Sequence, residues 1–188
     1  MAEFDFDAAR RWARLDRQRT LARRSADKLP FVDVNLVGGQ GLLLDTCVYI
    51  DQMQDRSPQV LDDLVAQRQV NHSIVAIQEL MHTVGVLNPS DARTAGVINE
   101  IGKQVKAMPP HRIFAPDIEV LGRAALLSGI LCRLRGYEKD GKLRALQDCT
   151  LFLQAQKLGL VVLTANISDY DILLQIISAG RALFYRQR

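Results

Sequence analysis

The sequence predicts an α/β domain, in which a short, mostly parallel sheet lies between layers of helices and follows an N-terminal helical arm. From residue 42 onward, short apolar runs alternate with segments that have helical patterning, as in a doubly covered α/β sheet. The runs are apolar at successive positions, which is typical of strands buried on both faces. With 188 residues and 48% apolar residues, the chain can bury one full core.

Residues 1–40 are expected to form a basic arm that ends in a glycine joint. A helix is expected from about Asp7, a plausible N-cap, to about Lys28, and Pro30 ends it. The first 30 residues hold eight basic residues and five acids, whereas the rest of the chain holds 16 of each sign. The net charge of +3 therefore belongs to the arm. The glycines of residues 37–41 precede a strand, so they do not form a dinucleotide-binding loop.

The arm has three interpretations, which the sequence leaves open. At 100° per residue, Arg10, Arg14 and Arg17 fall on one stripe of the expected helix, where they could bind RNA phosphates. Trp12 and Leu15 lie roughly opposite and could pack against the domain or a neighbouring subunit. The arm could also be a solvated helix.

The α/β domain is expected over residues 41–188, and its first elements are set by apolar runs and helix-start signals. Leu42–Leu44 is an expected strand, and Asp45-Thr46 ends it where a helix begins. Ser57-Pro58 is a good N-cap and N1 pair. The elements expected next are a helix at 57–69, a strand at 70–75, and helices at 76–86 and from about 91 to 109.

The second half of the domain follows the same rhythm. Pro116-Asp117 opens an apolar helix to about Leu134, and the polar stretch 136–142 is an expected loop. Asp148 is expected to begin a helix, and Ser168 is expected to cap another. The remaining expected elements are strands at 112–115, 160–163 and 182–185, and helices at 148–158 and 168–179.

Four acidic residues fall near the expected strand ends. Asp45 ends the first strand, Glu79 lies one turn inside the helix after the second, and Asp148 begins the helix that precedes the strand at 160–163. Asp169 follows that strand. Asp51 is excluded from this group, because it lies about 240° round its helix from Asp45 and should point away from the other acids. Sites in parallel sheets lie at the carboxyl edge. Acids converging there favour Mg²⁺ or Mn²⁺, ions that support phosphodiester hydrolysis.

The segments that carry these acids resemble the motifs of PIN-domain nucleases. Residues 43–50 resemble the opening strand and first acid, and residues 73–80 resemble the second element, in which a serine precedes the acid by six residues. Residues 148–170 resemble the third element, with an acid, a glycine, a threonine that ends the strand and a final acid–aromatic pair. The resemblance covers about residues 41–185 and is most like VapC-type toxins. This sequence departs from the pattern in its long N-terminal arm and in Gln147, where asparagine is common.

The resemblance implies a PIN-like three-layer fold and a Mg²⁺- or Mn²⁺-dependent ribonuclease. The implied catalytic and metal-holding acids are Asp45, Glu79, Asp148 and Asp169, with Thr46, Thr164, Asn166 and Asp171 as the surrounding polar residues. In this scheme Asp45, Asp148 and Glu79 hold the principal ion, and Asp169 serves a second ion or the attacking water.

The expected partners are an RNA substrate, a protein antitoxin and a second copy of the chain in a homodimer. A cytoplasmic protein is expected, because the longest mostly apolar stretch, residues 124–132, is far shorter than a membrane span. Three cysteines without a CxxC motif argue against a disulfide framework and a structural zinc site.

Three other functions remain alternatives at this point. A DNA- or flap-directed nuclease would use the same acids, and a non-catalytic PIN-type module would keep the fold without the chemistry. A phospho-acceptor receiver domain also has acids at its strand ends, but it needs a lysine late in the sheet, and residues 182–185 contain none.

Overall fold

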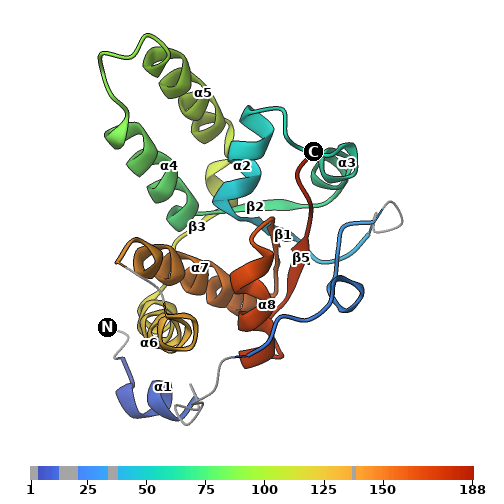
Figure 1. Cartoon of the computed structure of the whole chain (residues 1–188), viewed down its shortest axis with the longest axis vertical. Coiled ribbons are helices and arrows are strands. Elements are labelled where there is room, and N and C mark those ends of the chain that lie inside the picture. Colours follow the sequence, from blue (N-terminus) through green and yellow to red (C-terminus); the bar gives the residue numbers. More distant parts are fainter. Residues whose placement is uncertain (1–3, 13–20, 34–37, 137–138) are drawn as a thin grey trace.

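A computed structural model describes residues 4–12, 21–33, 38–136 and 139–188, without the side chains of Trp12, Lys139 and Asp140. Its centre is a parallel sheet with the strand order β3-β2-β1-β4-β5 (Figure 1). The strands are β1 (Leu42–Leu44), β2 (Val70–Ser73), β3 (Ile113–Phe114), β4 (Val161–Thr164) and β5 (Ala182–Phe184). Strand β1 lies in the middle, so the residue that follows it, Asp45, is placed at the centre of the sheet's carboxyl edge.

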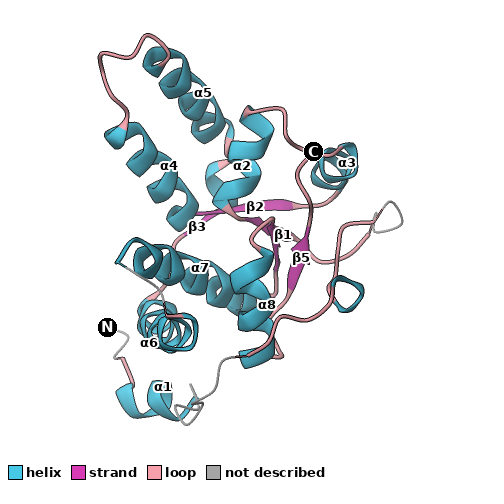
Figure 2. Ribbon diagram, viewed as in Figure 1, coloured by secondary structure: helices cyan, strands magenta, loops and turns pink. Residues whose placement is uncertain are grey.

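Helices cover both faces of this sheet (Figure 2). One layer contains α2 (Thr46–Met53), α3 (Gln59–Gln67), α4 (Ile74–Val86) and α5 (Thr94–Ala107), and the other contains α6 (Ile118–Arg135), α7 (Lys139–Leu158) and α8 (Ile167–Ile176). Two short 3₁₀ turns, η1 (Ala26–Lys28) and η2 (Pro110–Arg112), and the helix α1 (Phe6–Trp12) complete the described elements. The predicted three-layer α/β fold with a parallel sheet is confirmed.

Alternation along the central strand explains why two cores form. Leu42 and Leu44 belong to the hydrophobic cluster under α2–α5, whereas Leu43 belongs to the cluster under α6–α8. Successive side chains of a strand point to opposite faces, so an uninterrupted Leu-Leu-Leu run serves both layers. All three residues are at most 2% exposed.

The five expected strands are confirmed to within a few residues, but one predicted loop is wrong. Helix α7 begins at Lys139, so residues 139–142 are helical and Asp148 lies in the middle of the helix, not at its start. The residues before Asp148 are mostly strong helix formers, such as Lys142, Leu143 and Ala145. Their polarity suggested a loop, although it reflects the exposed side of a helix.

The arm also differs from the predicted continuous helix. Helix α1 ends at Trp12, and the next described residues, Leu21–Ser25, are not helical. Their polar groups bond to α8 instead, because the Ala22 carbonyl accepts from Gln175 and the Arg24 amide donates to Asp171. Arg14, Arg17 and Leu15 lie outside the described residues.

The described part of the arm packs on the rest of the chain. The Phe4 ring lies against Gly122 of α6, where a Cβ would be 2.1 Å from the ring. Leu29 joins the core under α6–α8, and Phe31 forms a parallel bridge with Phe184 of β5. The division at residue 40 stays a prediction, but residues 29–31 contribute directly to the packing of the sheet. Among the described residues, no helix is long and apolar enough to cross a membrane.

Candidate active site at the carboxyl edge of the sheet

The four predicted acids come from four separate elements and meet at the carboxyl edge of the sheet. Asp45 is the N-cap of α2, Glu79 lies in α4, Asp148 lies in α7, and Asp169 lies in the first turn of α8. Their charges act on one another, since Asp45, Asp169 and Glu79 all repel the ionised form of Asp148. Asp45, Asp148 and Asp169 are each at most 7% exposed, so this is a buried acidic cluster. We call these four residues the acidic cluster.

Asp45 is fixed by three donors. Its Oδ1 accepts from the Thr46 amide at 2.7 Å, which is the cap bond of α2. Its Oδ2 accepts from the Thr164 hydroxyl at 2.5 Å and from the Cys47 thiol at 3.3 Å. The Thr164 hydroxyl in turn accepts from the Asn166 amide at 2.8 Å, so the end of β4 orients the acid that follows β1.

Asn166 joins the other two aspartates. Its side-chain amide donates to Asp148 at 2.9 Å and to Asp169 at 3.3 Å, while its Oδ1 accepts from the Asp169 backbone amide. Asn166 is therefore the N-cap of α8, and the prediction that Ser168 caps this helix is wrong. The cap lies two residues earlier because asparagine can accept from the N3 amide and still donate to two carboxylates.

Burial and mutual repulsion change the acidity of the cluster. Burial, followed by the charges of Asp45, Asp169 and Glu79, raises the pKa of Asp148 well above its usual value. Burial also raises the pKa of Asp45, against hydrogen bonds from Thr164, Cys47 and Thr46 that lower it. Burial and the Asp45 charge raise the pKa of Glu79 to about 7, although a hydrogen bond with Thr46 and the charge of Arg144 oppose this rise. Acids held in this way favour either protons or a cation between them.

The donor chemistry of the cluster suits a hard divalent ion. Carboxylate oxygens are the ligands that Mg²⁺ and Mn²⁺ prefer, and burial together with mutual repulsion disfavours the ionised forms of Asp148 and Glu79 in the ion-free protein. Within the described ranges, no group of three or more His, Cys, Asp and Glu side chains is arranged to hold a metal ion as it stands. Mg²⁺ usually keeps several waters and takes only one or two carboxylates, so the Asp45 and Asp148 carboxylates fit a hydrated ion.

One of the other predicted site residues, Asp171, differs from expectation in its contacts. Thr46 and Thr164 bond to Glu79 and Asp45, respectively, inside the cluster. Asp171, which was expected beside the site, instead accepts from Arg24 of the arm at 2.6 Å. The reason is geometric, because a residue two positions after Asp169 points to the other side of a helix. Arg10 is exposed on α1, and Arg14 and Arg17 fall outside the described ranges.

Three residues of the site were not found from the sequence. Cys47 accepts from the Ala165 amide and donates to Asp45, and burial raises the pKa of its thiol, so it is a packing and hydrogen-bonding residue. Arg144 lies one turn before Asp148 on the exposed side of α7, and its spacing of four residues could have identified it. Among the described residues the buried Tyr170 hydroxyl has no hydrogen-bond partner, and burial, followed by the charges of Asp45 and Asp148, raises its pKa.

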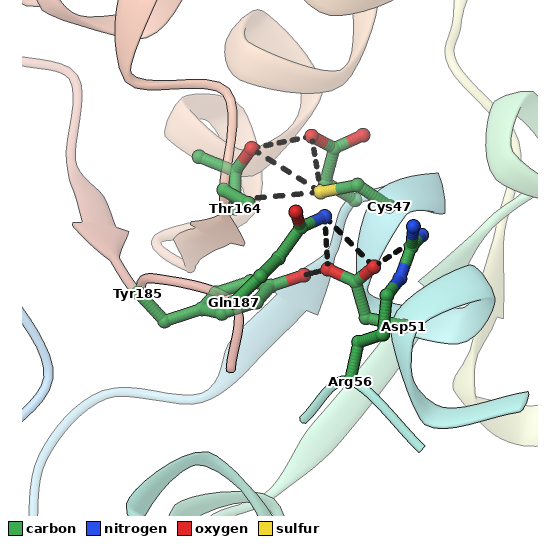
Figure 3. A network of polar contacts seen from close by, with 8 residues as sticks. Cys47, Asp51, Arg56, Thr164, Tyr185 and Gln187 are labelled. Carbon is green, nitrogen blue, oxygen red and sulfur yellow. Dashed lines mark hydrogen bonds and ion pairs between the residues drawn. The ribbon is translucent and has the colours of Figure 1, made fainter. Parts of the chain in front are cut away.

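A second polar network lies beside the acidic cluster (Figure 3). Asp51 is fully buried and accepts from the Tyr185 hydroxyl at 2.7 Å, from Gln187 at 2.9 Å and from Arg56 at 2.8 Å. These contacts fix the chain after β5 to the end of α2. Asp51 is thus paired within its own network and is not one of the acids that repel Asp148.

The raised pKa of Glu79 predicts a pH dependence of stability. Its pKa rises from the usual 4.5 to about 7 on folding, so the folded state holds a proton more tightly than the unfolded state. This contribution to stability is fully present below about pH 4.5 and is lost as the pH rises through 7. With EDTA present, Glu79→Gln should therefore stabilise the protein at pH 8 by about 1–3 kcal/mol and have little effect near pH 4.5. Urea unfolding at the two pH values tests this, and an equal effect at both would contradict it.

Comparisons with known proteins agree with the fold. No protein-family profile and no curated protein matches this sequence. Among solved structures, the chain is similar to VapBC2 from Rickettsia felis bound to a DNA fragment from their promoter, with a TM-score of 0.53 and 11% identity over 78% of this chain and 99% of that chain. VapBC-1 from nontypeable Haemophilus influenzae gives a TM-score of 0.52 and 17% identity, over 77% of this chain and 97% of that chain. DNA-bound VapBC from Salmonella typhimurium gives a TM-score of 0.51 and 15% identity, also over 77% of this chain and 97% of that chain. At these identities the similarity shows a common fold.

Proposed function

We propose that this chain is a Mg²⁺- or Mn²⁺-dependent endoribonuclease that hydrolyses RNA phosphodiesters and acts as the toxin of a toxin–antitoxin pair. The observation that carries the proposal is the acidic cluster. Four carboxylates from four elements of the chain meet at the carboxyl edge of a parallel sheet, where burial and the charges of the other three raise the pKa of Asp148. A buried group of like charges costs free energy, so a cation-dependent function is the best explanation for it.

Each residue of the cluster has a role in this proposal. A bound divalent ion would polarise the phosphodiester and lower the pKa of a water molecule. Asp45 and Asp148 would hold the ion, and Thr164 and Asn166 orient their carboxylates through the hydrogen bonds described above. Glu79, whose pKa is raised by burial and by the Asp45 charge, would be the third carboxylate that holds the principal ion. Asp169 would orient the attacking water or serve a second ion.

The toxin role and the partners are further parts of the proposal. The structures with a similar fold are VapBC complexes. We therefore propose that a protein antitoxin is a partner of this chain. We further propose a cytoplasmic homodimer. RNA and DNA share the phosphodiester linkage that the acidic cluster would act on, so RNA specificity is proposed from the resemblance to VapC-type nucleases alone.

A cleavage assay with the full chain tests the proposed function. We expect end-labelled single-stranded or looped RNA to be cut internally when Mg²⁺ or Mn²⁺ is present and to remain intact with EDTA. Competition with unlabelled DNA of the same sequence separates the two nuclease classes, since a DNA-directed enzyme would cut the DNA faster. Intact RNA under all ionic conditions, with a folded protein, would favour the non-catalytic module.

A further inference from the structure

Arg144 is an exposed cation beside the acidic cluster. It precedes Asp148 by four residues in α7, so the two side chains lie on the same side of that helix, one turn apart. Burial and neighbouring carboxylates raise the pKa of Asp148 and of Glu79, and the Arg144 charge opposes both increases. Glu79 belongs to α4, which contacts α7. The Arg144 charge therefore acts on acids from two different helices.

Arg144 is not neutralised by an ion pair. Among the described residues it forms neither a salt bridge nor a hydrogen bond, although its charge reaches two carboxylates. The arginines beside two buried aspartates outside the cluster are paired directly, Arg24 with Asp171 at 2.6 Å and Arg56 with Asp51 at 2.8 Å. The donors of the Arg144 guanidinium are thus available to a ligand at the site.

The early start of α7 fixes Arg144 relative to Asp148. Helix α7 begins at Lys139, so the backbone of residue 144 is held by the same helix as the acid. The later helix start expected from the sequence would have left Arg144 outside the helix. Electrostatic stabilisation of a reacting group requires charges that are fixed in advance, and a charge attached to the helix of a proposed metal ligand meets this requirement.

We propose that Arg144 binds a non-bridging oxygen of the RNA phosphate that is cleaved. This inference rests on the proposed function, because that phosphate belongs to the proposed substrate. A planar guanidinium suits phosphate oxygens, since it presents several donors in a fixed fork. Four carboxylates repel a phosphodiester, and a cation beside them offsets this repulsion. Cations fixed next to a reacting phosphoryl group also stabilise the transition state, so Arg144 is a catalytic residue in this proposal.

Binding measurements in EDTA test the contact without cleavage. A fluorescein-labelled single-stranded RNA 12-mer is titrated with the full chain at several KCl concentrations, and the affinity is followed by anisotropy. Arg144→Ala should reduce the slope of log affinity against log salt by about 0.7, the value of one single-strand phosphate contact. Lys142→Ala is the matched control and should leave the slope unchanged. Lys142 is exposed on the same helix, but its charge acts on Cys132 of α6 and not on the acids of α4 and α7.

Single-turnover cleavage with Mg²⁺ measures the contribution to catalysis. With protein in excess, Arg144→Ala should lower the maximal rate by about 100-fold. Arg144→Lys keeps the charge but not the fork and should recover part of the rate. The melting temperature should be unchanged in both variants, because the side chain is exposed. Mn²⁺ should still raise the melting temperature of Arg144→Ala, since Arg144 repels the ion and does not hold it. A variant damaged at the metal site would lose that increase.

The results separate the phosphate contact from the proposed function. An unchanged maximal rate in Arg144→Ala, in a wild type that cleaves RNA, would overturn the contact with the cleaved phosphate, whatever the salt slope. If the wild type binds RNA but never cleaves it, the proposed function fails, and the salt slope alone decides the contact. A slope reduced in Arg144→Ala and not in Lys142→Ala then supports the contact, and equal slopes in the two variants overturn it.

Discussion

Asp148→Asn should abolish RNA cleavage and leave the protein folded. The carboxylate of Asp148 is 6% exposed and is repelled by Asp45, Asp169 and Glu79. Asparagine has the same shape and still accepts the hydrogen bond from Asn166, so the packing around it should survive. Replacing residues that merely support a metal ligand costs 10- to 100-fold in activity. We therefore expect the loss of a proposed ligand to reduce the cleavage rate by more than about 100-fold.

The same substitution should stabilise the ion-free protein. Removing one charge from a group of repelling carboxylates lowers the electrostatic cost of folding, by about 1–2 kcal/mol at pH 8. Addition of Mn²⁺ should raise the melting temperature of the wild type and change that of Asp148→Asn much less. Asp63→Asn, an exposed acid of α3, is the matched control and should behave as the wild type in all three measurements. Full Mn²⁺-dependent cleavage by purified Asp148→Asn would refute the assignment of the site.

Arg24→Ala should destabilise the protein far more than a substitution of its neighbour Arg23. The Asp171 carboxylate is fully buried, and Arg24 contacts both of its oxygens, through Nε at 2.6 Å and through the backbone amide at 2.8 Å. Among the described residues, loss of the guanidinium leaves the buried Asp171 charge with the bond from the Arg24 backbone amide alone. We expect a loss of about 2–4 kcal/mol in urea unfolding, a range reduced from that of fully buried pairs because the Arg24 side chain is one-third exposed.

Two further variants check this assignment. Arg23→Ala removes an exposed arginine of the same segment and should cost less than about 0.5 kcal/mol. Asp171→Ala combined with Arg24→Ala should be more stable than the sum of the single changes predicts, because neither charge is then left unpaired. Equal losses for Arg23→Ala and Arg24→Ala would show that the ion pair does not attach the arm.

The sequence contained enough information to predict the sheet and to bring the four acids together. Apolar runs such as Leu42–Leu44 are buried on both faces, and such runs have few alternatives to a central strand. The positions of Asp45 and Asp169 then follow, because each lies just beyond the end of a parallel strand. These predictions depend on local sequence and on a rule of topology.

The contacts that were missed join residues that are distant in the sequence. Nothing local to Arg24 indicates that it pairs with Asp171, and the arm therefore resembled a continuous helix. Ser168 and Asn166 are both good N-caps, and only the proximity of Asp148 explains why asparagine takes that position. The first turns of α7 were missed for another reason, since their exposed polar side chains resemble those of a loop.

The bridge between Phe31 and Phe184 has a consequence for the solubility of the protein. Strand β5 is the last in the sheet, and its outer backbone groups could pair with a strand of another molecule. Instead, the Phe184 amide donates to the Pro30 carbonyl at 2.8 Å, and the Val32 amide donates to the Phe184 carbonyl at 2.7 Å. The backbone groups of Phe31 face the other way, and its amide already donates to the Leu29 carbonyl at 3.0 Å, so the outer side of this added segment is a poor template for further pairing. During synthesis on the ribosome, residues 30–32 emerge before β5. The segment that covers the outer edge of β5 is therefore available as soon as β5 forms, which disfavours edge-to-edge aggregation.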